Sequence, residues 1–258
     1  MLNSIYVQAF LFLVVFFSAF FVLAVVRKNN GLIDIGWGLG FVLSGNYALY
    51  ISGNYNLRSI LITLIVSIWG LRLAYHLFKR NWNKEEDYRY AKWRESWDHF
   101  YLKSYFRIFM LQAVLLFIIA SPIYKVVTSD FNALIATDYI GLFVWIVGFT
   151  FEYLADKQLA EFKRKDEEEK DGHVMKEGVW KYSRHPNYFG ETLIWWGVYI
   201  ITLSVQGGWK FIYSPLVITL LLLFVSGVPL LEKRYADDEE YQEYAEKTNK
   251  FFPWFPKH

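Results

Sequence analysis

The chain has 258 residues, of which 55% are hydrophobic and 21% aromatic, and its formal net charge is only +2. It contains no cysteine, which excludes disulfides, thiol catalysis and cysteine-ligated metal sites, and its small net charge gives no sign of nucleic-acid binding. Charged residues still make up 20% of the chain, so they must be separated in blocks from the apolar ones, as in multi-pass membrane proteins.

Seven apolar runs predict seven transmembrane helices. Most of the runs reach the roughly 20 residues that a helix needs to cross a bilayer, and the sixth is the shortest. The runs are 3–26, 32–52, 57–78, 105–127, 139–157, 190–205 and 212–231. The first run lacks the basic start and the cleavage site of a signal peptide, so we expect a retained helix. We predict an all-α, polytopic membrane protein with one domain over residues 1–258.

Lysine and arginine gather in alternate loops, which predicts the orientation in the membrane. Dense basic groups occupy residues 79–107 and 157–184, whereas the intervening loops hold only Arg58, Lys125 and Lys210. The positive-inside rule then places the N-terminus outside and the C-terminus in the cytoplasm.

The two long cytoplasmic loops have different compositions. The first carries Trp93, Trp97 and Tyr101 at a spacing of four residues, which predicts an amphipathic stretch in the membrane interface. The second, at residues 161–178, is a charge run with an acidic core at 167–169, which we interpret as a polar connector.

Ionisable side chains inside the apolar runs are costly in a bilayer and usually functional. Under this topology they all lie in the cytoplasmic half of their runs. They are Asp34, Arg72, Glu152, Asp156 and Glu191, with Glu232 at the end of the seventh run. We therefore predict one vestibule that opens to the cytosol, edged by the polar stretch WKYSRHPNYFGE at 180–191. Alternatively, each charge pairs locally, reaches the interface as Arg72 could, or caps a helix as Asp34 could.

Three segments offer side chains suited to a nucleotide with phosphates. Arginine binds phosphate through paired donors, carboxylates and asparagine suit ribose hydroxyls and carboxamides, and tyrosine and histidine stack on rings. The candidate cofactor-binding residues are Glu152, Asp156, Lys163, Arg164, Tyr182, Arg184, His185, Asn187, Tyr188, Glu191, Arg234 and Tyr235.

Local sequence patterns narrow the kind of nucleotide site. Pro186 disfavours helical geometry at His185, so the sixth helix is predicted to start at the proline and to present free N–H groups to an anion. Neither a G-x-G-x-x-G nor a Walker A sequence is present, so neither soluble nucleotide-binding fold applies. His185 has no second histidine or cysteine at ligand spacing, and no metal site is expected.

Two stretches, GVWKYSRHPNYFGE and EKRYADDEEYQEYAEKTNKFFPWFP, resemble the steroid 5α-reductase-like membrane proteins, most closely the bacterial branch designated DUF1295. DIGWGLGF at 34–41 and WGLRLAYHLFKRNWNKEEDYRYAKWRE at 69–95 resemble the same branch. The resemblance covers nearly the whole chain. It implies a seven-helix, cytosol-facing enzyme that uses NADPH to reduce the conjugated C=C of a lipophilic enone, such as a steroid-like or lipid molecule from the bilayer.

The resemblance also implies roles for cofactor-binding residues. Asp156 matches a cofactor-binding aspartate of the family, and Lys163 lies near a family arginine. Tyr182, Asn187 and Glu191 match the family's Y…N-x-x-G-E element. The basic-aromatic stretch that covers the cofactor in the family contains Arg234 and Tyr235 here.

On the substrate side, the family grips the substrate carbonyl with a carboxylate in the second span and a tyrosine in the third. Asp34 is the candidate for the carboxylate, and the third span offers Tyr75 and His76 for the second group. Trp37 and Arg72 are candidate substrate-binding residues. Reduction of a conjugated C=C needs a hydrogen-bond donor at the carbonyl as enolate charge grows, and a carboxylic acid kept protonated in an apolar span is such a donor.

Two other functions remain open. A membrane methyltransferase of the isoprenylcysteine carboxyl methyltransferase type also carries an R-H-P-x-Y element, but it would bind S-adenosylmethionine, which lacks phosphates. The basic residues at 163–164 suit phosphates and favour the reductase. A non-enzymatic lipid-binding or transport protein would explain the intramembrane charges but not the nucleotide-like set.

Overall fold

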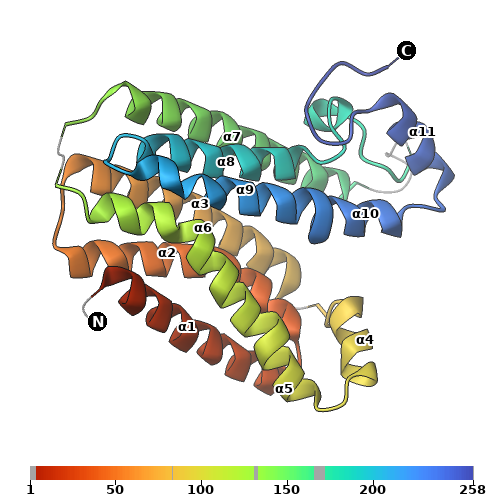
Figure 1. Cartoon of the computed structure of the whole chain (residues 1–258). Helices are drawn as coiled ribbons and strands as arrows, with labels where there is room; N and C mark the ends of the chain where they lie inside the picture. Colours follow the sequence, from red (N-terminus) through yellow and green to blue (C-terminus); the bar gives the residue numbers. More distant parts are fainter. Residues whose placement is uncertain (1–3, 83, 131–132, 166–171, 258) are drawn as a thin grey trace. The chain divides into compact units, whose positions relative to one another are not determined.

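The computed structural model describes residues 4–82, 84–130, 133–165 and 172–257, and these residues form helices and connecting segments with no β-strand among them (Figure 1). The acidic core at 167–169 lies outside the described residues. The all-α prediction is confirmed.

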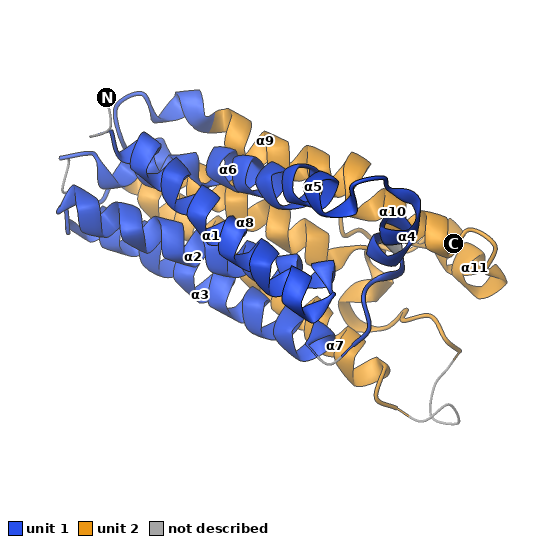
Figure 2. Ribbon diagram, turned by 90° about the horizontal axis from the view of Figure 1, so that it is seen from below, with its two compact units in different colours: residues 1–135, 202–211 blue, residues 136–201, 212–258 orange. Residues whose placement is uncertain are grey.

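The chain divides into two compact units, which Figure 2 colours separately. Unit 1 contains Met1–Ile135 and Thr202–Phe211, and unit 2 contains Ala136–Ile201 and Ile212–His258. The single domain over residues 1–258 stays a prediction.

The described residues of unit 1 form four long α-helices and two short ones. They are α1 (Ile5–Arg27), α2 (Ile33–Ser52), α3 (Leu57–Asn81), α4 (Tyr88–Ser96), α5 (Phe100–Ser104) and α6 (Leu111–Val127). A π-helical turn at Tyr105–Met110 joins α5 to α6. The chain leaves α1 through Lys28, which adopts a left-handed φ of 51°, and enters α3 at Asn56, whose side chain accepts the backbone N–H of Ser59 at 2.8 Å.

Glycine allows α2 and α3 to pack with their backbones close together. A Cβ added to Gly38 would lie 2.6 Å from the carbonyl oxygen of Gly70, and one added to Gly70 would lie 2.7 Å from that of Gly38. Any larger residue at either position would push the helices apart. Beside this contact, the rings of Phe41 and Trp69 pack at 5.4 Å between centroids.

Unit 2 consists of α7 (Ala136–Phe162), α8 (Pro186–Thr202, whose last residue is counted with unit 1), α9 (Tyr213–Leu220), α10 (Val228–Arg234) and α11 (Glu239–Lys247). Glycine again allows two helices to pack closely, because a Cβ on Gly148 of α7 would lie 2.7 Å from the carbonyl oxygen of Gly190 of α8. Asp238 caps α11 by accepting the N–H of Tyr241 at 2.9 Å.

Helices occur at all seven predicted positions, and five stretches within the described residues are long and apolar enough to cross a membrane. These five are Ile5–Arg27, Leu57–Asn81, Phe100–Val127, Ala136–Phe162 and Gly208–Arg234. The positions of the second and sixth predicted spans hold the 20-residue α2 and the 17-residue α8. A multi-pass membrane architecture follows, while the count of seven is not confirmed and the orientation of the termini stays a prediction.

The predicted interfacial stretch folds as two short helices. Trp93 and Trp97 stack with their ring centroids 5.0 Å apart, as their spacing of four predicts. The helix then breaks, because His99 adopts a left-handed φ of 52°, and Tyr101 belongs to α5. The location of these helices in the membrane interface stays a prediction.

Candidate functional site

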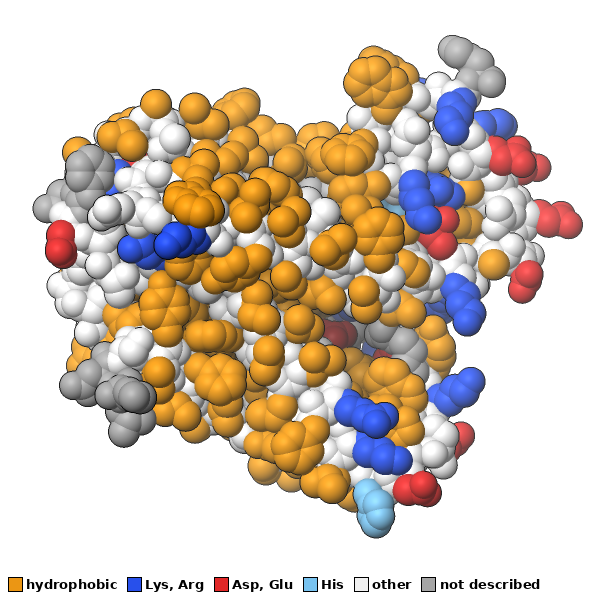
Figure 3. All heavy atoms as spheres, viewed as in Figure 1, with side chains coloured by type: hydrophobic (Ala, Val, Ile, Leu, Met, Phe, Trp, Pro, Cys, Tyr) orange, Lys and Arg blue, Asp and Glu red, His pale blue; other side chains and the backbone are white. Residues whose placement is uncertain are grey.

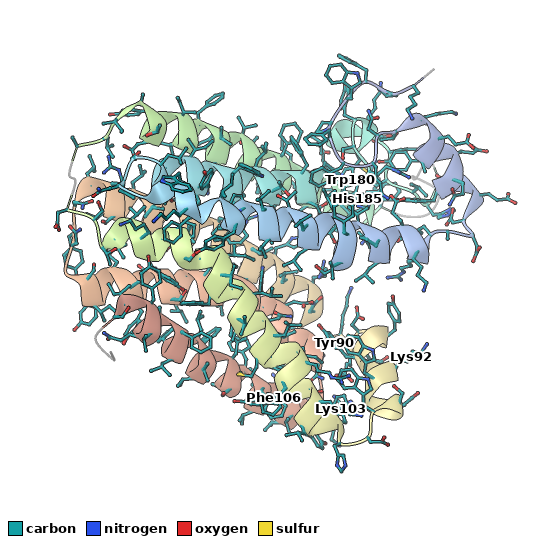
Figure 4. All side chains as sticks on the ribbon, viewed as in Figure 1. Tyr90, Lys92, Lys103, Phe106, Trp180 and His185 are labelled. Atoms are coloured by element: carbon teal, nitrogen blue, oxygen red, sulfur yellow. The ribbon has the colours of Figure 1, made fainter. Side chains whose placement is uncertain are left out.

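The polar stretch of unit 2 lies where the chain turns into α8 (Figure 4). Pro186 is the first residue of α8, as the sequence predicts. Just before it, Ser183 Oγ accepts the N–H of His185 at 3.1 Å and donates to the carbonyl of Phe251 at 2.7 Å. The indole of Trp180 donates to the carbonyl of Ala155 in α7 at 3.1 Å. These bonds fix residues 180–186 against α7 and the C-terminal segment.

Glu232, at the end of α10, is the acceptor of a compact polar cluster. Its carboxylate accepts from His185 Nε2 and from the Tyr241 hydroxyl, both at 3.0 Å, and lies 3.2 Å from Arg184 Nη1. The His185 ring also stacks on Tyr188, with centroids 5.7 Å apart. We call Arg184, His185, Glu232 and Tyr241 the Glu232 cluster.

Burial sets the protonation state of His185, whose side chain is only 2% exposed. Burial lowers the pKa of His185, and the hydrogen bond with Glu232 only partly opposes this effect. The ring is therefore neutral near pH 7, with Nε2 donating to Glu232 and Nδ1 left as an acceptor. Burial, with the nearby charge of Glu232, also raises the pKa of Tyr241 and keeps its hydroxyl protonated.

Three polar atoms in this stretch are buried and have no hydrogen-bond partner among the described residues. They are Nε of Arg184, Nδ1 of His185 and Oδ1 of Asn187. Buried polar atoms in folded proteins are nearly always satisfied, so each such atom calls for an explanation. One donor and two acceptors within residues 184–187 are suited to a polar ligand.

Two carboxylates of α7 lie beside this stretch. Glu152 is 3% exposed and Asp156 is 9% exposed, and they are one helical turn apart. A Cβ on Gly190 would lie 2.5 Å from the backbone nitrogen of Glu152, so this part of α7 directly contacts the first turns of α8. Glu191, the next residue of α8, is half-buried.

The remaining predicted cofactor residues lie at the periphery of unit 2. Lys163 and Arg164 follow the end of α7 and are exposed. Tyr182 is 38% exposed. The Arg234 guanidinium lies 6.0 Å from the ring centroid of Tyr235. These basic groups can reach a ligand in solvent more readily than the buried groups can.

The predicted substrate-side residues belong to unit 1. Asp34 lies in the first turn of α2, and Trp37 follows one turn later; both are half-buried. The indole of Trp37 packs edge-on against Phe41 at 5.2 Å. An acid in the first turn of a helix also interacts favourably with the helix dipole, so the capping alternative for Asp34 remains open.

On α3, the three candidates differ in exposure. Arg72 and His76 are half-buried, whereas Tyr75 is 60% exposed. The Tyr75 ring lies under the ammonium group of Lys79, which is 5.1 Å from its centroid. Of the two candidates for the family's tyrosine, His76 has the more protected position, and both roles stay predictions.

Three residues that organise the site had no predicted binding partner or cofactor role. Glu232 was predicted only as one of the ionisable groups of the vestibule, at the end of a span, and no role was predicted for Tyr241 and Tyr244. The Tyr244 hydroxyl donates to the carbonyls of Trp180 at 2.5 Å and Ser183 at 3.2 Å. The available signal was the Y-x-x-Y spacing in an acidic helix after the last span, which puts both hydroxyls on one face.

Comparison with known proteins identifies the family. The family described as "protein of unknown function (DUF1295)" matches residues 20–248. An uncharacterised protein of Schizosaccharomyces pombe is 26% identical over 258 residues, which cover 89% of this chain and 74% of that protein. The steroid 5-alpha-reductase DET2 of Arabidopsis thaliana is 34% identical over 76 residues, which cover 29% of this chain and 28% of that protein. No solved structure gives a match. Because the family match extends over most of the sequence, the chain belongs to the DUF1295 family.

Proposed function

We propose that the protein is a membrane reductase that binds NADPH and transfers hydride to the conjugated C=C of a lipid or steroid-like enone. The partial similarity to a steroid 5-alpha-reductase supports the class of reaction. The observation that carries the proposal is the set of buried, unpartnered polar atoms at residues 184–187, next to the carboxylates of α7.

These unpartnered atoms fit the polar groups of a pyridine nucleotide. Because His185 is neutral, its Nδ1 and the Asn187 Oδ1 are both acceptors, and a carboxamide NH₂ group offers two donors. Asp156 and Glu152 supply further acceptors suited to ribose hydroxyls. Bound NADPH supplies the hydride, and the protein's residues bind it, orient it and exclude water.

The Glu232 cluster changes the expected role of Arg184. Its Nη1 is already paired with a carboxylate, so the guanidinium does not offer a full fork to a phosphate. We propose that Arg184 contributes a single hydrogen bond from Nε. The phosphate charge is then balanced mainly by the exposed Lys163, Arg164 and Arg234.

On the substrate side, we propose that Asp34 donates a hydrogen bond to the enone carbonyl. Negative charge grows on that oxygen as the double bond is reduced, so a positioned donor stabilises the transition state more than the ground state. The donor must be the protonated acid, which an apolar span favours.

A ligand comparison tests the proposal against the methyltransferase alternative. We expect NADPH to raise the melting temperature of the detergent-purified protein, and to raise it more at higher NADPH concentrations. S-adenosylmethionine should leave the melting temperature unchanged. Stabilisation by S-adenosylmethionine alone would overturn the reductase assignment.

Variants then separate cofactor binding from turnover. Asp156→Ala and Arg184→Ala should weaken the NADPH-dependent shift, with Asp237→Ala on the exposed surface as the matched control for the first. Asp34→Asn should retain the NADPH shift but lower NADPH oxidation in the presence of lipid enones. An Asp34→Asn protein with full turnover would remove Asp34 from the mechanism.

A further inference from the structure

The segment after α11 exposes three large aromatic side chains. Phe252 and Trp254 are each 70% exposed, and Phe255 is 72% exposed. Exposed apolar patches of this kind on a folded surface commonly mark interaction sites. We call these three residues the tail patch.

The backbone of the tail patch is held in place by hydrogen bonds. The carbonyl of Phe251 accepts from Ser183 Oγ at 2.7 Å, and the N–H of Trp254 donates to the carbonyl of Tyr182 at 3.0 Å. The N–H of Arg184 donates to the carbonyl of Asn249 at 2.9 Å. The chain thus anchors this segment on the same residues that build the candidate site, while its aromatic side chains remain exposed.

An apolar path connects the tail patch to a candidate membrane span. The ring centroids of Phe252 and of Phe189 in α8 are 5.8 Å apart, and those of Phe189 and of Phe151 in α7 are 5.4 Å apart. Along α7 the exposed large hydrophobic residues recur on a helical face within the span. They are Tyr139, Ile140, Phe143, Ile146 and Tyr153. The tail patch is therefore linked by ring contacts, through Phe189 and Phe151, to the middle of a helix that carries an exposed apolar face.

Basic residues flank the tail patch. Lys250 precedes it and Lys257 follows it, and both are exposed. Figure 3 shows Lys and Arg side chains close to exposed hydrophobic ones on this part of the surface. Tryptophan prefers the headgroup level of a bilayer, phenylalanine inserts at the boundary between headgroups and acyl chains, and nearby lysines are attracted to the phosphates of anionic lipids. The ring contacts that link the tail patch to a candidate membrane span, together with the flanking lysines, favour a lipid surface over a protein partner.

We propose that the tail patch inserts into the headgroup region of an anionic lipid leaflet and anchors residues 182–187 at the membrane surface. The anchor joins the lipid boundary directly to the segment that carries the unpartnered polar atoms. It stands independently of the reductase assignment, because it rests on exposure, backbone bonding and the apolar path.

The absence of cysteine allows a direct test. Single variants Phe252→Cys, Trp254→Cys and Phe255→Cys are labelled with the fluorophore NBD and reconstituted in vesicles of phosphatidylcholine and phosphatidylglycerol. Glu246→Cys, on an exposed position of α11, is the matched control. We expect blue-shifted emission from the three tail labels, strong quenching by lipids that carry a shallow spin label, and protection from aqueous iodide. The control label should show no blue shift, little quenching by the spin-labelled lipid and strong quenching by aqueous iodide.

Each labelled variant loses only one aromatic ring, so the other two rings of the tail patch can still insert. Equal iodide quenching at the tail and control positions, with no quenching by spin-labelled lipid, would overturn the anchor. A blue shift that grows with the protein-to-lipid ratio, without quenching by the spin-labelled lipid, would also overturn the anchor. That result would indicate that the tail patch contacts another copy of the chain. In vesicles of phosphatidylcholine alone, we expect lipid quenching to weaken but persist, since the rings insert without charge attraction.

Discussion

Units 1 and 2 bury ionisable groups to very different extents. In unit 2, Asp138, Glu152, Asp156 and His185 are each at most 9% exposed. Among the described residues of unit 1, the side chains of Arg58 and Glu86 are buried to this degree. The Arg58 guanidinium donates to the carbonyl of Ala133, and Glu86 pairs with Arg94 at 2.8 Å. The buried charges of unit 1 are thus paired within that unit, whereas unit 2 retains buried polar atoms suited to a ligand.

The largest expected effect comes from removing the central acceptor of unit 2. Glu232→Ala leaves the nearly buried His185 and the Arg184 charge without their shared carboxylate. We expect a loss of about 3 kcal/mol in the free energy of unfolding, the low end for breaking a buried pair because Glu232 is partly exposed. Denaturant unfolding in detergent measures it.

Glu243→Ala is the matched control, because Glu243 is exposed on α11 and should change the stability by no more than about 0.5 kcal/mol. Equal stability of the Glu232→Ala and Glu243→Ala proteins would show that the Glu232 cluster does not organise unit 2.

The next effect concerns a feature that both units share, close helix packing at glycine. Gly38→Ala places a Cβ 2.6 Å from a backbone oxygen, so we expect a loss of about 1 to 3 kcal/mol from overpacking. Gly45→Ala on the same helix meets only Ile123, at 3.7 Å, and should be neutral or stabilising through better helix propensity. Thermal unfolding of the two variants separates the cases, and a Gly38→Ala protein as stable as Gly45→Ala would contradict the contact between α2 and α3.

A smaller, pH-dependent effect is expected at the start of α11. His173 Nε2 lies 2.6 Å from Asp238 Oδ2, and its Nδ1 lies 2.7 Å from Glu240 Oε2. The N–H of Tyr241 and the contact with His173 hold the pKa of Asp238 below its ordinary value. Burial alone would raise the pKa of Glu240, but hydrogen bonds from His173 and Lys176 outweigh it and lower that pKa.

Because folding lowers both pKa values, the two ionised carboxylates stabilise α11 at pH values above their unfolded-state pKa values of about 4. This stabilisation is lost as the pH falls through the lower folded-state pKa values. We expect hydrogen-exchange protection of α11 to drop below about pH 4, and Asp238→Asn to flatten that drop while keeping the helix cap. Asp237→Asn should retain the wild-type profile. If Asp238→Asn keeps the wild-type pH dependence of hydrogen-exchange protection, the contact between Asp238 and His173 is not the source of the loss of protection at low pH.

The smallest effect is expected at Tyr75 of unit 1. Its side chain is 60% exposed, so Tyr75→Phe should change stability by no more than about 0.5 kcal/mol. If His76 is the group that assists Asp34, Tyr75→Phe also retains NADPH oxidation with an enone, while His76→Phe loses it. Loss of turnover in Tyr75→Phe alone would reverse that choice.

Much of the architecture follows from local sequence. The apolar runs located the helices, and Pro186 placed the start of α8, because both depend on short-range rules of composition and backbone geometry. The ends of the helices were less predictable: α7 extends from 136 to 162 rather than 139 to 157, since polar residues can continue a helix beyond the apolar run.

The site itself depends on contacts between residues far apart in the chain. Nothing near Glu232 in the sequence indicates that its carboxylate pairs with Arg184 and His185, almost fifty residues earlier. The pairing of Arg184 therefore could not be anticipated, and the sequence alone favoured a free phosphate fork. Tyr244 was missed for the same reason, because its acceptors at 180 and 183 lie in another segment.

The central claim is that the unpartnered atoms at residues 184–187 hold a pyridine nucleotide, and the dissociation constant of NADPH tests it most directly. We predict that Asn187→Ala weakens NADPH binding about 10-fold, as expected for one lost hydrogen bond of about 1.4 kcal/mol. Gln242→Ala, which removes an amide from an exposed position of α11, should leave the constant unchanged. Equal NADPH affinities for wild type, Asn187→Ala and Gln242→Ala, or no measurable NADPH binding to the wild type, would contradict the account.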